Sequence, residues 1–130
     1  MSRLEDEERY LSLATFRRSG EEVRTPVWFA STPGGGGRSF WIYTNAKTGK
    51  VKRLRRDPRA RVAACDVRGR VHGEWLEARA HSIEGEAAQQ PAFDALLAKY
   101  GWQMRALKLA AQLGGRWPDR TISAVDLSAP

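Results

Sequence analysis

The sequence predicts an α+β domain of about six antiparallel strands that close into a small barrel, with short helices inserted between them. Three observations support this prediction. Segments that alternate apolar and polar residues recur along the chain, most of the connections between them are short, and 42% of the residues are hydrophobic, which suits a packed core. With 130 residues the chain has the length of one domain, which we expect to span residues 1–130.

The first quarter of the chain predicts one helix and two strands. We expect a short helix over Arg3–Tyr10, a β-prone segment over Leu11–Phe16 and a turn over Arg17–Glu22. Val23–Ala30 then alternates with a period of two, as a strand does. Because Pro26 has no N–H to donate to a neighbouring strand, this strand is expected at a sheet edge or at a bulge.

The next segments predict a hairpin strand followed by a basic helix. Pro33–Gly37 reads as a flexible hairpin connection; its glycines resemble a phosphate loop only weakly, since no helix follows them. The aromatic and β-branched run Ser39–Thr44 favours a strand. Thr48–Arg56 is expected to be a short helix that directs Val51 and Leu54 inward.

The second half predicts three more strands and two helices. Strands are expected over Arg61–Val67 and His72–Ile83, separated by a turn, and a last strand over Arg120–Leu127. Glu86–Gly101 is expected to be an amphipathic helix, followed directly by a second helix over Trp102–Leu113.

The positive charge of the chain is concentrated in one segment. Lys47–Arg61 holds eight basic residues and one acidic residue, a formal charge of +7, which equals the net charge of the whole chain. The other residues are balanced, with 14 basic and 14 acidic side chains. Such a focused patch predicts an anionic ligand, which could be nucleic acid, lipid headgroups or the phosphate of a small cofactor.

The start of the basic helix is the strongest candidate for an anion site. Helix N-termini present unpaired N–H groups, Gly49 permits a close backbone approach, and Lys47 and Lys50 supply charge. Thr44 and Thr48 can add hydroxyl donors. The alternative is a solvated basic helix face without a ligand. Binding to nucleic acid is less favoured, because strands flank the helix and no aromatic residue interrupts the basic run.

Other chemistries have little support in the sequence. One cysteine, Cys65, excludes an intrachain disulfide and a cysteine-based zinc cluster. His72 and His81 lack the spacing of a metal-binding pair and are expected to be ordinary strand residues. We see no export signal and no apolar run of the roughly 20 residues that span a bilayer, so a cytoplasmic location without a membrane span is expected.

Several motifs together resemble a known family. Arg24-Thr25-Pro26-Val27-Trp28, the run Phe40–Asn45, Thr48 and Lys50 with the basic helix, and Lys99–Trp102 are similar to segments of the pyridoxamine phosphate oxidase-like flavoproteins. The combination most resembles the branch that uses the deazaflavin coenzyme F420. This resemblance implies an FMN-binding split β-barrel fold of six strands, a homodimer with the cofactor at the subunit interface, and hydride transfer to a small organic molecule.

The resemblance also implies which residues bind the cofactor. Lys50, Thr48 and Thr44 would hold its phosphate, with help from Arg24, Lys47 and the backbone at Gly49, while Thr25, Pro26 and Val27 would lie along the ring. Arg53, Arg55 and Arg56 would meet the oligoglutamate tail that coenzyme F420 carries and flavin mononucleotide (FMN) lacks. FMN remains the alternative cofactor, and no catalytic side chain is assigned.

The chain departs from a true pyridoxamine phosphate oxidase in two places. The family's phosphate clamp would have an arginine beside the lysine, where this chain has Gly49. The C-terminal segment Asp119–Pro130 has only Arg120 and lacks a substrate-binding pair of arginine and histidine. Vitamin oxidation is therefore not expected.

Overall fold

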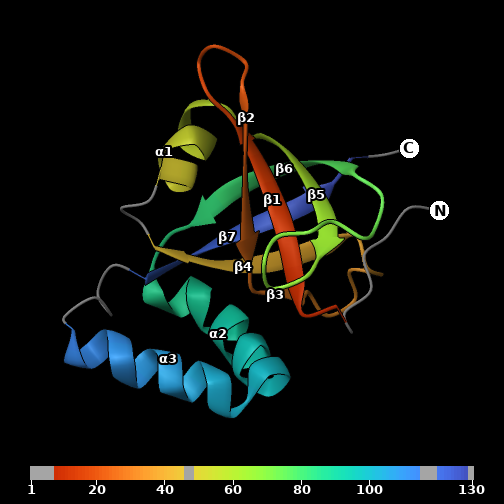
Figure 1. Cartoon of the computed structure of the whole chain (residues 1–130). Helices are drawn as coiled ribbons and strands as arrows, with labels where there is room; N and C mark the ends of the chain where they lie inside the picture. Colours follow the sequence, from red (N-terminus) through yellow and green to blue (C-terminus); the bar gives the residue numbers. More distant parts are fainter. Residues whose placement is uncertain (1–7, 46–48, 115–119, 129–130) are drawn as a thin grey trace.

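The computed structural model describes residues 8–45, 49–114 and 120–128, which form seven strands and three helices (Figure 1). The elements are β1 (Tyr10–Phe16), β2 (Glu22–Val27), β3 (Phe29–Ser31), β4 (Ser39–Asn45), α1 (Gly49–Arg56), β5 (Arg59–Cys65), β6 (Leu76–Ile83), α2 (Glu86–Tyr100), α3 (Trp102–Leu113) and β7 (Arg120–Leu127). None of the described helices is long and apolar enough to cross a bilayer.

All described strands belong to one antiparallel sheet with the order β2-β1-β5-β6-β7-β4-β3. The two edge strands, β2 and β3, are separated in the chain only by Trp28. A sheet whose opposite edges are joined by one residue must curl until the edges meet. The carbonyl of Trp28 accepts a hydrogen bond from the N–H of Tyr43 in β4 at 3.1 Å, which extends the β3–β4 pairing to the linking residue, and β2 also contacts β4. The predicted α+β barrel is therefore confirmed.

Side chains alternate between the barrel interior and its outer face. The interior holds the larger cluster of buried apolar residues, including Leu11, Phe29 and Ile42. A second cluster lies between the sheet and the helices α2 and α3 and includes Leu96 and Ile122. The alternation is the reason that the strand pattern could be recognised in the sequence.

The helices lie at two places on the barrel (Figure 1). Helix α1 packs against β1 and β6 with Val51 and Leu54 buried, as predicted. Helix α2 packs against β3 and β7, and α3 packs against α2. Since α1 follows β4 and packs near the end of β1, its basic residues come close to the β1–β2 turn.

The strand count differs from the prediction, since the sheet has seven strands rather than six. The expected strand Val23–Ala30 is divided at Trp28, because β2 pairs with β1 whereas β3 pairs with β4. A period-two pattern shows which face is buried, but it does not show where a strand changes its pairing partner. The edge position of Pro26 is confirmed, since β2 is an edge strand.

Several boundaries also differ from the prediction. Of the expected helix Arg3–Tyr10, residues 3–7 lie outside the described residues and Tyr10 begins β1. The strand predicted at Arg61–Val67 is β5, Arg59–Cys65. The strand predicted at His72–Ile83 begins only at Leu76; before it, the chain meets β5 through an isolated bridge of Val71 to Cys65 and a hydrogen bond from the N–H of His72 to the carbonyl of Ala64 at 3.0 Å.

Candidate functional site

A groove of about 320 Å³ follows the open edge of β2 and contains part of the predicted site. We call it the β2-edge groove; its lining residues are Tyr10, Pro26, Val27, Trp28, Tyr43, Lys50, Val67 and Leu107. Most of them are apolar or aromatic, and Lys50 is the only cation among them. The groove therefore combines an apolar wall with one positive charge at the start of α1.

Lys50 is the predicted site residue that the structure places most clearly. It is the second residue of α1 and half-buried, and no described residue forms an ion pair or hydrogen bond with its ammonium group. Burial lowers the pKa of Lys50, and the nearby charge of Arg53 lowers it further. A bound anion would raise the pKa of Lys50 again, because it would place an opposite charge beside the ammonium group.

Thr44 ends the interior face of β4 just before the connection to α1. Its side chain is 3% exposed, and no described residue hydrogen-bonds to its Oγ1 atom. Buried hydroxyl groups nearly always have a partner, so this atom is a candidate ligand-binding group. Lys47 and Thr48, the other predicted phosphate ligands, lie outside the described residues.

Arg53 lies over the start of α1. Its Nε atom donates to Thr15 Oγ1 at 2.6 Å, and a Cβ atom added to Gly49 would lie 2.7 Å from its Nη1 atom. A side chain at Gly49 would therefore push Arg53 away from the helix start. Burial lowers the pKa of Arg53, as do the charges of Arg17 and Arg56.

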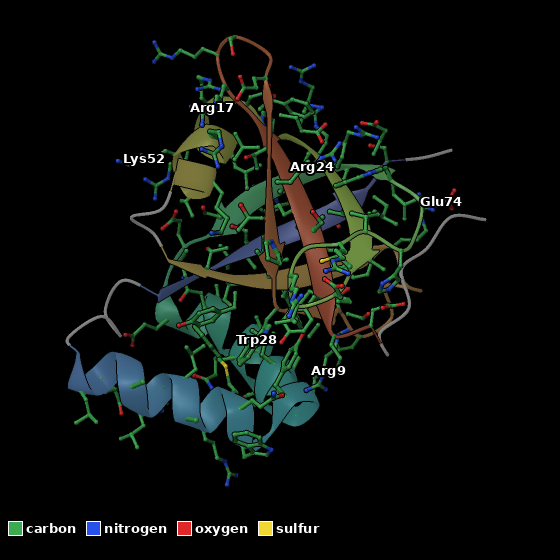
Figure 2. All side chains as sticks on the ribbon, in the orientation of Figure 1. Arg9, Arg17, Arg24, Trp28, Lys52 and Glu74 are labelled. Atoms are coloured by element: carbon green, nitrogen blue, oxygen red, sulfur yellow. The ribbon has the colours of Figure 1, made fainter. Side chains whose placement is uncertain are left out.

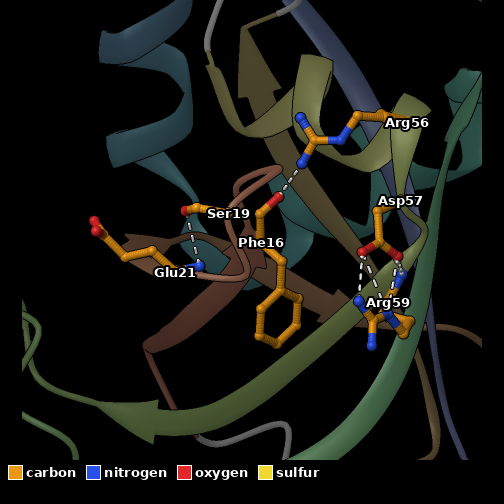
Figure 3. A network of polar contacts seen from close by, with 6 residues as sticks. All are labelled: Phe16, Ser19, Glu21, Arg56, Asp57 and Arg59. Carbon is orange, nitrogen blue, oxygen red and sulfur yellow. Dashed lines mark hydrogen bonds and ion pairs between the residues drawn. The ribbon is translucent and has the colours of Figure 1, made fainter.

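The other two arginines predicted for the tail point in different directions. Arg56 donates to the backbone carbonyl of Phe16, at the end of β1 (Figure 3). Arg55 is exposed and lines a different cavity of about 330 Å³, together with His81, Ser82 and Glu84 among others. The structure thus brings Arg53 and Arg56 together at the β1 end and leaves Arg55 apart from them.

Arg24 is engaged outside the β2-edge groove. Its Nε atom lies 2.5 Å from Glu22, which also accepts a hydrogen bond from Arg61 at 2.9 Å. Both guanidinium groups lie over the ring of Trp75, at 4.6 and 5.1 Å from its centroid. The hydrogen bond from Arg24 is the main cause of the lowered pKa of Glu22. Thr25 pairs with Leu13 and does not line the groove either.

The aromatic part of the groove depends on α2. Trp28 stacks on Tyr100, with ring centroids 4.5 Å apart and an angle of 10° between the planes. The Tyr100 hydroxyl accepts the N–H of Phe29 at 3.0 Å and donates to the carbonyl of Arg9 at 2.9 Å. Figure 2 shows Trp28 between the barrel and the helical pair. The sequence suggested a tryptophan wall for a flat ring, but not that Tyr10, Val67 and Leu107 would join it.

A separate cavity of about 310 Å³ lies between α2 and α3. Its wall includes Phe93, Asp94, Met104 and Arg105. The ring of Phe93 lies edge-on to Tyr43, with centroids 6.2 Å apart, so this aromatic pair separates the cavity from the β2-edge groove.

Neither histidine lies in the groove. His72 Nε2 is 2.9 Å from Glu8, and His81 lines the cavity that contains Arg55. Cys65 is buried, and its burial raises the pKa of the thiol. Within the described residues, no cluster of three or more metal-ligating side chains is present.

Solved structures confirm the fold. A conserved hypothetical protein of Mycobacterium tuberculosis is 23% identical, with a TM-score of 0.67 over 93% of this chain and 74% of that one. The heme storage protein HutZ of Vibrio cholerae is 15% identical, with a TM-score of 0.67 over 99% of this chain and 93% of that one. A Clostridium acetobutylicum protein of the pyridoxinephosphate oxidase family, related to a general stress protein, is 17% identical, with a TM-score of 0.64 over 92% of this chain and 75% of that one.

The family comparison is more specific than these structures. No curated protein matches the sequence. The family model described as pyridoxamine 5'-phosphate oxidase, however, matches residues 2–127, nearly the whole chain. Together with the split barrel, this match shows that the chain belongs to the pyridoxamine 5'-phosphate oxidase family.

Proposed function

We propose that this protein is an oxidoreductase that binds coenzyme F420 and transfers hydride between this deazaflavin and a small organic molecule. The observation that carries the proposal is the β2-edge groove, in which an apolar and aromatic wall leads to the half-buried Lys50. A flat ring system that carries a phosphate on a flexible chain matches this combination of surfaces. The family membership supports a cofactor of this kind.

The phosphate end of the groove has groups that fit an anion. Lys50 offers an ammonium group without a described anionic partner. Thr44 does not line the groove, but it follows the groove residue Tyr43 in β4, and its buried hydroxyl without a described partner belongs to the proposal as a second ligand. Helix starts carry N–H groups without intrahelical partners, and α1 begins at Gly49, next to Lys50, with the guanidinium group of Arg53 over Gly49. Lys47 and Thr48 belong to the proposal as additional ligands from the preceding connection.

The ring end of the groove would orient the cofactor and exclude water. Pro26 and Val27 lie on the open edge of β2, so their backbone is not covered by a further strand. Trp28 is held in place by its stacking on Tyr100. When bound, the cofactor supplies the hydride chemistry, and the chain supplies position, a dry wall and positive charge.

We further propose that the protein is a homodimer in which a second copy closes the groove. Val67, which lines the groove, is 62% exposed, and Trp102, Leu109 and Leu113 on α3 are 76%, 58% and 81% exposed. Large exposed apolar side chains are typical of association surfaces. Light scattering at micromolar concentration should give twice the chain mass; a stable monomer would contradict an interface site.

The central experiment is a fluorescence titration of the protein with coenzyme F420 and, separately, with FMN. A charge-assisted contact to phosphate contributes roughly 1.5–3 kcal/mol, so Lys50→Ala should weaken F420 binding by about 10- to 150-fold. Lys52→Ala is the matched control, because Lys52 lies on the same helix but is exposed. Equal affinities of both variants would remove the phosphate assignment.

The same titration separates the alternatives. Preferential binding of FMN would identify an FMN protein of the same family. Binding of duplex DNA with a steep salt dependence, and no response to either cofactor, would instead favour the nucleic-acid interpretation of the basic segment.

A further inference from the structure

The cavity between α2 and α3 lies outside the β2-edge groove and has no role in the proposed function. The two helices lie side by side next to the barrel and meet at Gly101, whose φ of 57° allows the chain to reverse between them (Figure 1). The cavity volume of about 310 Å³ is typical of a site for one small molecule. The residues that α2 contributes recur every three or four positions and therefore share one face of the helix: Gln90, Phe93, Asp94 and Leu97.

Three side chains give the cavity an apolar wall. Met104 of α3 is buried, and the half-buried Phe93 packs against the same cluster of apolar residues. Leu97 also lines the cavity and remains 37% exposed. A ligand with an apolar side chain of several carbons would remove this surface from water, which favours its binding.

The two helices contribute opposite charges to the same cavity. Asp94 of α2 accepts a hydrogen bond from Gln90 of its own helix, at 2.8 Å, and forms no ion pair with a described residue. The side chain of Arg105 on α3 forms no ion pair or hydrogen bond with any described residue. Lys108, one turn further along α3, is a second cation on that side. Asp94 and Arg105 therefore face the cavity without being paired with each other, and both keep capacity for a ligand.

We infer that the cavity between α2 and α3 binds a free α-amino acid with a large apolar side chain. Its ammonium group binds Asp94, its carboxylate binds the guanidinium group of Arg105, and its side chain covers the wall of Phe93, Leu97 and Met104. A ligand with one charge would match one side of the cavity and be repelled by the other, so a zwitterion is the complementary class. The inference goes beyond the proposed function and does not depend on coenzyme F420.

The methyl group of Met104 is a direct probe of this cavity. The chain has only two methionines, so protein labelled with ¹³C at the methionine methyl groups gives a simple NMR spectrum, in which Met104→Leu identifies the Met104 signal. The full chain is titrated with L-phenylalanine, with N-acetyl-L-phenylalanine, which lacks the ammonium group, and with L-phenylalaninamide, which lacks the carboxylate. Phenylalanine should shift the Met104 signal with a millimolar dissociation constant, as expected for a ligand of about twelve non-hydrogen atoms. Each derivative should bind about two- to fivefold more weakly, because it loses one exposed ion pair.

Two variants of the chain assign the charges of the ligand. Asp94→Asn should weaken phenylalanine binding about two- to fivefold and leave the N-acetyl form unchanged, whereas Arg105→Gln should weaken phenylalanine equally and leave the amide unchanged. The matched controls are Glu84→Gln and Arg79→Gln, because both side chains are exposed, lie outside the cavity and pair with no described residue. The controls should change none of the three affinities, and thermal melts check that all four variants fold.

Two kinds of result would overturn the inference. A Met104 signal that stays unchanged up to the solubility limit of phenylalanine would show that the cavity binds no such amino acid. Equal affinities for phenylalanine and its two derivatives, or equal losses in the variants and their controls, would show that Asp94 and Arg105 do not select the ligand. Because no measurement here uses coenzyme F420, either result leaves the proposed function standing, and failure of F420 binding leaves the amino-acid site standing.

Discussion

Replacing Tyr100 by phenylalanine tests how α2 is attached to the barrel beneath the groove. The hydroxyl of Tyr100, a residue that is 4% exposed, accepts the N–H of Phe29, which is fully buried, and donates to the carbonyl of Arg9. Removing it leaves a buried donor without a partner, which costs about 1–3 kcal/mol. We therefore expect a loss of about 2 kcal/mol in the free energy of unfolding, or a fall in Tm of roughly 6–10 °C at this chain length.

Urea denaturation and thermal melts followed by circular dichroism would measure this loss. Tyr10→Phe is the matched control, because it also removes one phenol hydroxyl, but from a half-buried side chain whose hydroxyl hydrogen-bonds to no described residue. The ring of Tyr100 stays stacked on Trp28 in the phenylalanine variant, so cofactor affinity should change little, whereas Tyr100→Leu should reduce it. Equal melting temperatures for the two phenylalanine variants would refute the reasoning.

Three further predictions concern single groups. The pKa of Lys50 is lowered in the free protein, and a bound anion would raise it. F420 affinity should therefore fall, by at most about tenfold per pH unit, as the pH rises from the pKa of the free protein, which lies below the ordinary 10.5, to the higher pKa of the complex. The affinity of Lys50→Arg should stay constant over this range in the same titrations. Hydrogen bonds from Arg59 lower the pKa of Asp57 to about 2 from 3.8. The ionised carboxylate therefore stabilises the fold in full above pH 3.8, and this stabilisation is lost as the pH falls to 2. In acid unfolding, the stability of Asp57→Asn should lack this pH-dependent loss. Thr44→Val replaces a hydroxyl that has no described partner, so its unfolding free energy should stay within about 1 kcal/mol of the parent while F420 affinity falls; a larger destabilisation would reveal a structural partner.

The extent of the barrel could be predicted from the sequence because each strand has one face in the interior. Phe40 and Ile42 in β4 alternate with less buried residues, and so do Leu76, Ala78 and Ala80 in β6, whereas both faces of β1 are buried. The seventh strand could not be predicted. Its existence depends on the change of pairing partner at Trp28, which involves residues far apart in the chain.

The candidate site shows the same division. Lys50 and Thr44 could be proposed from a strand that leads into a basic helix, since helix starts bind anions whatever surrounds them. The direction of each arginine side chain could not be predicted from the sequence, because it depends on which neighbour the side chain meets in the folded chain. Arg53 reaches Thr15 and Arg56 reaches Phe16, whereas Arg55 lines another cavity.

By itself, the sequence determined that a focused positive charge follows an aromatic strand, that strands such as β4 and β6 bury alternate residues, and that the motifs resemble a flavoprotein family. These properties depend on local order along the chain, so they are present before the chain folds. Only the tertiary structure decided that Arg24 is engaged by Glu22 and Trp75, that Tyr100 supports Trp28, and that Arg53 and Arg56 of α1 reach the end of β1. These contacts join residues brought together by the curling of one sheet, and side-chain direction and charge environment are settled only when that sheet closes.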